Sequence, residues 1–179
     1  MSNIEKSKTR EITLTAVFAA LLCVISPFAV PIGPISVTLA TFAVYLSGAV
    51  LGAKRGGAAV GVYLLLGFVG LPVFSGFAGG FQQLFGATGG YLVGYIPCAF
   101  LSGAFADKIG KPWAYPVGMI AGTVVLYALG TAWFCALTGS ALLHALTLCV
   151  LPFLFGDAIK IACASVLGSK LRKVLSPRA

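Results

Sequence analysis

Charged residues are almost absent from the interior of this 179-residue chain, and their distribution limits the possible folds more than any other feature. The segment from Ile12 to Ala53 has no charged residue, and neither has the segment from Gly56 to Ala106. About 20 apolar residues are enough to cross the hydrocarbon core of a bilayer, so each segment is long enough for two crossings. Only 9% of all residues are charged, against about 25% in soluble domains. We therefore expect an integral membrane protein.

Helix breakers and polar turns divide the apolar sequence into six predicted transmembrane helices. The Pro31–Pro34 stretch interrupts the first apolar segment, because proline lacks the N–H that a helix interior requires. Later divisions are expected at Lys54-Arg55, at the charged turn 107–111 and at the turn 138–140. We expect one all-α membrane domain over residues 1–179. Its approximate spans are 13–30, 36–53, 56–71, 89–106, 115–137 and 152–169, the last apolar segment starting near residue 142.

The basic residues alternate between the two sides of the predicted spans. Of the 12 Lys and Arg residues, 11 lie in the N-terminal segment, in the turns after the second and fourth spans, and in the C-terminal tail. The other three connections have none. Cytoplasmic loops of membrane proteins are enriched in Lys and Arg, so this pattern predicts six spans with both termini in the cytoplasm. The net charge of +8 then reflects membrane topology, and we expect no nucleic-acid partner.

Asp157 and Lys160 are the only charged residues that do not lie at the edge of an apolar segment. Their spacing of three residues places both on one face of a helix, where the side chains can meet. An ionisable group within a membrane is costly and commonly marks a functional site. The alternative is a purely structural ion pair that locks two helices together. We expect the pair to lie in the middle or outer half of the membrane.

The segment from Leu71 to Gly86 does not have a helical pattern, since proline, serine, four glycines and two glutamines alternate with four phenylalanines. Such irregular backbone persists at membrane depth only where protein buries it or where it lines a cavity. We expect this outer loop and the Asp157/Lys160 pair to meet in an outward-facing pocket, with apolar walls and a few polar groups. The alternatives are core or lipid-facing aromatic side chains and a solvated glutamine pair. The predicted substrate-binding residues are Asp157, Lys160, Tyr91, Gln82, Gln83, Gly89, Gly90, Phe74, Phe77 and Tyr127.

No recognised catalytic or metal-binding motif occurs in the sequence. It has no G-x-x-x-x-G-K-[ST] loop for ATP, no G-x-S-x-G and no H-E-x-x-H. His144 is the only histidine, and the five cysteines form no C-x-x-C pair. We therefore expect a protein that is not an enzyme, with no catalytic residues, no cofactor and no metal site.

Small residues recur at four-residue spacing at Gly86, Gly90 and Gly94, at Gly118 and Gly122, and at Ala16 and Ala20. Such spacing lets helices approach closely. For the glycines we expect packing inside the molecule. For the alanine pair the pattern by itself is weak, because alanine is common in helices.

Taken together, these segments resemble the BioY family, the biotin-capturing S components of energy-coupling-factor (ECF) transporters. The resemblance covers nearly the whole chain. Its motifs are GLPVF at 70–74, GFAGG at 76–80, GATGGYLVGY at 86–95 and PFLFGDAIK at 152–160. One departure is Ala87, where the family pattern has proline.

The resemblance implies high-affinity capture of biotin by a multi-pass protein of the bacterial plasma membrane. It also implies that a transmembrane coupling subunit and two ATPase subunits are partners, with Ala16 and Ala20 at the interface to the coupling subunit. We expect a ureido N–H of biotin on Asp157 and its carboxylate on Lys160. The competing hypotheses are a self-sufficient transporter of another vitamin, a membrane-embedded enzyme and a structural membrane subunit.

Overall fold

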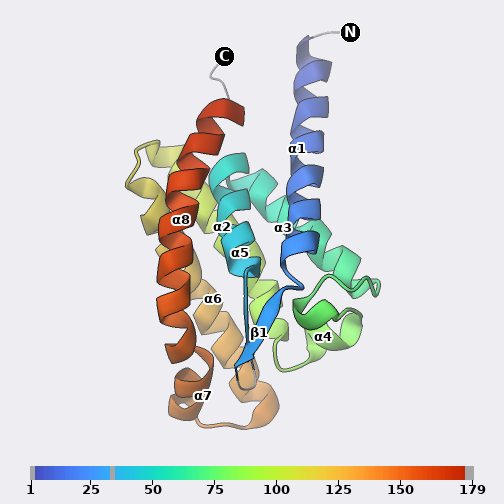
Figure 1. Ribbon diagram of the computed structural model, residues 1–179, viewed down its shortest axis with the longest axis vertical. Coiled ribbons are helices and arrows are strands. Elements are labelled where there is room, and N and C mark those ends of the chain that lie inside the picture. Colours follow the sequence, from blue (N-terminus) through green and yellow to red (C-terminus); the bar gives the residue numbers. More distant parts are fainter. Residues whose placement is uncertain (1–2, 33–34, 176–179) are drawn as a thin grey trace.

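The protein is a bundle of helices with one small β-hairpin (Figure 1). The computed structural model describes residues 3–32 and 35–175, so Pro34, which was expected to interrupt the first apolar segment, lies outside the described residues. The long elements are α1 (Asn3–Ile25), α2 (Ala40–Leu51), α3 (Ala53–Phe68), α5 (Gly89–Ile109), α6 (Ala114–Thr138) and α8 (Leu151–Leu175). The short elements are β1 (Ala29–Ile32), β2 (Ile35–Thr38), the 3₁₀ turn η1 (Ser75–Phe77), α4 (Phe81–Phe85) and α7 (Leu142–Cys149).

Three helices of the described chain, α5, α6 and α8, are both long enough and apolar enough to cross a membrane. The start of α1 and the end of α8 lie at the same end of the molecule, whereas the hairpin, α4 and α7 lie at the opposite end (Figure 1). The polar groups of a helix backbone are satisfied within the helix, which suits these elements to a bilayer.

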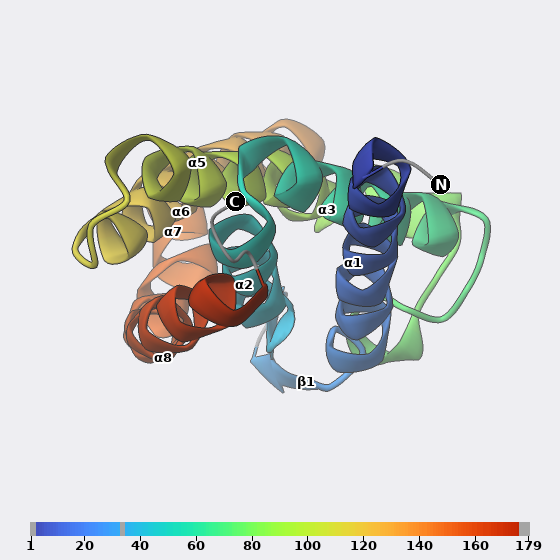
Figure 2. The same cartoon turned by 90° about the horizontal axis from the view of Figure 1, so that it is seen from above.

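α2 lies at the centre of the bundle. Seen from the end that carries the termini, it lies between α1, α8 and α5 (Figure 2). All of its residues except Phe42 are buried. A helix that is apolar on every side belongs inside a larger assembly of helices, and α2 therefore forms the core against which the other helices pack.

The close packing of α5 on α6 depends on glycines. A Cβ atom at Gly90 would come within 2.3 Å of Trp133 Cβ, and one at Gly122 within 2.8 Å of the Cys98 carbonyl oxygen. The predicted internal packing role of Gly90, Gly94, Gly118 and Gly122 is confirmed by such contacts. Gly86 instead lies in the turn before α5, close to the carbonyl oxygen of Gln82.

The expected all-α fold is confirmed for the bundle, to which β1 and β2 add one short antiparallel pair of strands with Ala29 opposite Thr38. α1 ends at Ile25, so the first predicted span, 13–30, is helical only as far as that residue. α2 begins at Ala40, so the second predicted span, 36–53, starts in β2 and is helical only from that residue. Its predicted end, marked by Lys54-Arg55, also differs slightly. The break between α2 and α3 falls at Gly52, whose φ of +85° favours glycine.

The predicted irregular segment is observed between α3 and α5. It contains only η1 and the five-residue α4 between stretches of turn and bend. This segment lies at the same end as the hairpin (Figure 1). The fold therefore places two non-helical segments next to the end of the bundle opposite the chain termini.

Candidate functional site

Asp157 and Lys160 of α8 form an ion pair inside the bundle. The distance from Lys160 Nζ to Asp157 Oδ1 is 2.9 Å, and the two side chains are only 11% and 5% exposed, respectively. The contact that the i, i+3 spacing predicts is therefore observed. Isolated charges are very costly to bury, so a buried pair needs further hydrogen bonds.

Two hydroxyl groups from neighbouring helices supply these hydrogen bonds. Thr41, the second residue of α2, donates to Asp157 Oδ1 at 3.1 Å and accepts a hydrogen bond from Lys160 Nζ at 3.0 Å. Tyr127 of α6 donates to Asp157 Oδ2 at 2.6 Å. Thr41, Tyr127, Asp157 and Lys160 are called the polar cluster below. It joins three helices that are far apart in the sequence.

The hydrogen-bond capacity of the polar cluster is not used up. A carboxylate has about four acceptor positions and an ammonium group has three N–H donors. Asp157 accepts three hydrogen bonds and Lys160 donates two within the described chain. One acceptor position on Asp157 and one donor on Lys160 are therefore left for another molecule.

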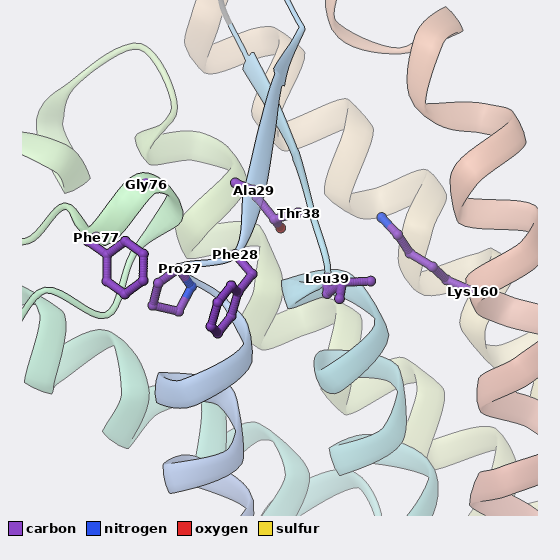
Figure 3. A pocket seen from close by; sticks show the side chains of 8 residues that line it. All are labelled: Pro27, Phe28, Ala29, Thr38, Leu39, Gly76, Phe77 and Lys160. Atoms are coloured by element: carbon purple, nitrogen blue, oxygen red, sulfur yellow. The ribbon is translucent and has the colours of Figure 1, made fainter.

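A cavity of about 560 Å³ lies next to the cluster, and Lys160 lines it. Its other walls are the end of α1 and the flanks of the hairpin (Pro27, Phe28, Ala29, Thr38, Leu39) and the η1 turn (Gly76, Phe77). Figure 3 shows the Lys160 side chain extending from α8 toward the hairpin. The volume falls within the range of roughly 300–1,000 Å³ that is usual for small-molecule sites.

Some of the predicted substrate-binding residues lie at the cavity or in the polar cluster, and others do not. Lys160 and Phe77 line the cavity, and Asp157 and Tyr127 lie in the cluster behind Lys160. Phe74, by contrast, is buried and packs edge-on against Tyr63, with ring centroids 5.6 Å apart. These contacts make Phe74 part of the core beneath the loop.

For the remaining predicted substrate-binding residues, the structure shows their positions and their contacts within the protein. The hydroxyl groups of Tyr91 and Thr131 are hydrogen-bonded at 3.1 Å. Gly89 and Gly90 lie where α5 meets Trp133 of α6. Gln82 and Gln83 lie on α4, and the side chain of Gln82 is exposed. Their role in substrate binding stays a prediction.

Thr41 is the member of the cluster that sequence reasoning missed. Thr123 and Thr131 also lie in apolar helices and also form hydrogen bonds. Nothing in the sequence distinguishes Thr41 from them, because its partners lie 116 and 119 residues away along the chain. Only the packing of α2 on α8 identifies it.

Ala16 and Ala20 lie on α1 and are both exposed. Ala16 also lines a shallow cavity of about 380 Å³ between α1 and α3. Because both side chains are short, another helix could approach the backbone of α1 closely at this place on the outside of the bundle.

A second ion pair lies at the opposite end of the molecule. Arg172 of α8 pairs with Asp107 of α5, and the two side chains are 25% and 40% exposed. Arg172 also donates to the carbonyl oxygen of Ala49 at 3.2 Å, and Asp107 accepts from the N–H of Ala53 at 2.9 Å. This pair, called the terminal-end clasp below, connects α8 to α5 and to the α2–α3 junction.

Known proteins are similar to this chain in both sequence and fold. The model of the BioY family matches residues 1–177. The chain belongs to the BioY family. It is 39% identical over 165 residues to the biotin transporter BioY of Thermotoga maritima, covering 92% of this chain and 97% of that relative. It is 37% identical over 175 residues to the biotin transporter BioY2 of Lactococcus lactis, covering 97% of this chain and 96% of the relative.

A solved structure of the same fold is the S component for biotin from an ECF-type ABC transporter. It matches with a TM-score of 0.87 at 29% identity, over 97% of this chain and 95% of that one. BioY relatives are transporters and not enzymes, which agrees with the absence of catalytic motifs. The protein is thus a membrane-embedded member of a multi-pass transporter family.

Proposed function

We propose that the protein captures biotin in an outward-facing site and delivers it through an energy-coupling module. The observation that carries this proposal is the buried polar cluster beside a cavity of about 560 Å³, in a chain whose relatives are named biotin transporters. Buried ionic groups with unused hydrogen-bonding capacity are expected at a binding site, since a purely structural pair needs no open position.

The chemistry of biotin matches the groups that are present. Its ureido ring offers N–H donors, its thiophane ring and valeryl chain are apolar, and its carboxylate is negative. We assign a ureido N–H to the open acceptor position of Asp157 and the carboxylate to the open N–H of Lys160. The apolar part then contacts Phe77 and the hairpin flank, which the cavity places beside Lys160. Tyr91, Gln82, Gln83, Gly89, Gly90 and Phe74 complete the proposed site as a second layer.

We assign six crossings to one membrane domain, with both termini in the cytoplasm. Two observations support this topology. Basic residues gather at alternate connections of the chain, and α1 begins at the end of the bundle where α8 ends (Figure 1). The cavity beside Lys160 then belongs to the outer half of the protein, where biotin arrives.

Transport needs partners, because the sequence has no phosphate-binding loop that would hydrolyse ATP. The structural relative is a component of an ECF-type ABC transporter. By this likeness we assign a transmembrane coupling subunit and two ATPase subunits as partners. The exposed Ala16 and Ala20 on α1 are the proposed contact with the coupling subunit.

Titration calorimetry of the purified protein with biotin tests the proposed capture. We expect tight binding that falls by at least about 100-fold in Asp157→Asn and in Lys160→Ala, since removing one partner of a buried ion pair costs about 3–5 kcal/mol. A folded, monodisperse parent protein that does not bind biotin would refute the capture role.

The orientation of the ligand has a separate test. Biotin methyl ester lacks the negative carboxylate, so it should bind the parent less tightly than biotin and should lose little when Lys160 is replaced by alanine. If Lys160→Ala weakens the ester and free biotin by the same factor, the carboxylate does not lie on Lys160.

A further inference from the structure

A second cavity, of about 380 Å³, lies at the end of the bundle that carries the chain termini. Leu51 and Ala53, at the α2–α3 junction, form one wall, and Phe100 and Ala104 of α5 form the other. Lys54, Arg55, Asp107 and Lys108 complete its lining. The apolar walls and the charged rim together give this groove two distinct chemistries.

The positive charges of the rim are only partly neutralised. Asp107 is paired with Arg172, and Arg55 is paired with Glu11 at 3.1 Å. Lys54 and Lys108 form no ion pair within the described part of the chain, and both side chains are exposed. The rim therefore presents two uncompensated ammonium groups beside two neutralised pairs, and it favours an anion.

Apolar and charged positions follow one another along a single face of α5. Phe100, Ala104 and Lys108 are spaced four residues apart, so they lie one above the other on the helix. Phe100 is 47% exposed. Eight residues of helix rise about 12 Å. The exposed ring of Phe100 therefore lies about 12 Å along α5 from the level of Lys108.

We propose that this groove binds an anionic phospholipid of the cytoplasmic leaflet. The phosphate lies between Lys54 and Lys108, and an acyl chain runs past Ala104 along Phe100. A free phosphate would contact only the charged rim, whereas a phospholipid would contact the rim with its headgroup and the apolar walls with an acyl chain. Basic pockets between membrane helices on the cytoplasmic side suit such headgroups. This site goes beyond biotin capture, and its place in the cytoplasmic leaflet rests on the proposed topology with both termini in the cytoplasm.

Native mass spectrometry of the full chain in detergent, titrated with phosphatidylglycerol or phosphatidylcholine, tests the groove. Each lysine near a membrane surface contributes about 1 kcal/mol, or about fivefold. We expect phosphatidylglycerol to bind the parent in preference to phosphatidylcholine, and Lys54→Gln/Lys108→Gln to weaken it by about 25-fold. The matched control is Lys111→Gln/Lys173→Gln, which removes the same charge from exposed positions at the same end outside the groove. The control should change affinity by less than about threefold.

Ala104→Trp provides an independent variant, since it fills the apolar part of the groove without changing any charge. It should weaken the binding of phosphatidylglycerol by about tenfold, the scale of one well-packed apolar contact. Unchanged biotin binding at the other end of the molecule would show that the variant is folded. Equal losses in the two lysine pairs, or equal binding of the two lipids, would overturn the proposal. So would loss of the coupling subunit on purification of Lys54→Gln/Lys108→Gln with phosphatidylglycerol binding unchanged, because the groove would then serve a protein partner.

Discussion

Two ion pairs lie near opposite ends of α8, one within the helix and one between α8 and α5, and they differ in what surrounds them. The Asp157–Lys160 pair is 5% and 11% exposed and has hydroxyl partners on α2 and α6. The Asp107–Arg172 pair is 40% and 25% exposed, and its further partners are backbone groups at the α2–α3 junction. The first lines the cavity of about 560 Å³ through Lys160, and the second lines the groove of about 380 Å³ through Asp107.

The comparison suggests a test that separates a binding role from a fastening role. Backbone groups supply part of the hydrogen bonding of the terminal-end clasp. Solvent reaches its remaining positions and screens its charges, so we expect it to contribute little beyond holding helix ends together. The polar cluster is buried, so its charges interact strongly and its open positions are costly without a ligand. Two carboxylate–cation pairs that involve the same helix are thus expected to serve different purposes, because their burial and the groups around them differ.

The largest difference is expected between the variants Asp157→Asn and Asp107→Asn. Asp157→Asn leaves Lys160 buried without its counter-charge, and breaking a buried pair costs about 3–5 kcal/mol. Biotin affinity should fall by at least about 100-fold, and the melting temperature should fall as well. Asp107→Asn should leave biotin affinity within about twofold, since exposed pairs contribute about 0–1 kcal/mol.

The double variant Asp157→Asn/Lys160→Gln sharpens this result. It removes both charges, so thermal stability measured by scanning fluorimetry should recover relative to Asp157→Asn while biotin uptake stays lost. Recovery of uptake together with stability would mean that the polar cluster is only a structural fastening, like the clasp.

Thr41→Val should have the next largest effect. Valine has nearly the shape of threonine but removes a donor to Asp157 and an acceptor for Lys160. We expect biotin affinity to fall by about 10- to 100-fold, because leaving charged groups unsatisfied costs about 1.5–3 kcal/mol. Thr41→Ser keeps the hydroxyl and should stay within about threefold of the parent. Equal behaviour of the two variants in calorimetry would remove Thr41 from the site.

Tyr127→Phe should have a smaller effect, because only one hydrogen bond to Asp157 is lost and Oδ1 keeps its two donors. The expected loss of biotin affinity is about 5- to 10-fold. Tyr115→Phe, on the same helix but outside the cluster, is the control and should not change binding. A loss in the control as large as in Tyr127→Phe would show that packing of α6, and not the hydroxyl, is responsible.

Arg172→Gln should have the smallest effect on function. We expect biotin affinity within about twofold of the parent and a loss of stability of about 1 kcal/mol, as for a half-exposed pair. High salt should lower the stability of the parent toward that of the variant, because exposed charges are screened. A change of more than tenfold in biotin affinity would contradict the separation of the two ion pairs.

Much of the molecule could be predicted because its signals are local. The uncharged segments indicate a membrane protein, and the spacing of Asp157 and Lys160 predicts their contact. The hairpin and Thr41 were not predictable from local patterns. Residues 29–38 are as apolar as the helices around them, and Thr41 acquires its partners only when α2 packs against α8. The burial of Phe74 was not predictable either, because the sequence of a loop does not reveal which of its aromatic side chains will be buried.

The shortness of α2 has a mechanical consequence. Its 12 residues rise about 18 Å, well short of a hydrocarbon core of about 30 Å. The four residues of β2, just before it, add about 13 Å, so the proposed second crossing is part strand and part helix, and Thr41 lies just after the joint. A two-stranded hairpin is only marginally stable by itself. We therefore expect this wall of the cavity to be easier to displace than a helix, and its displacement would leave the Thr41 hydroxyl in place within the core.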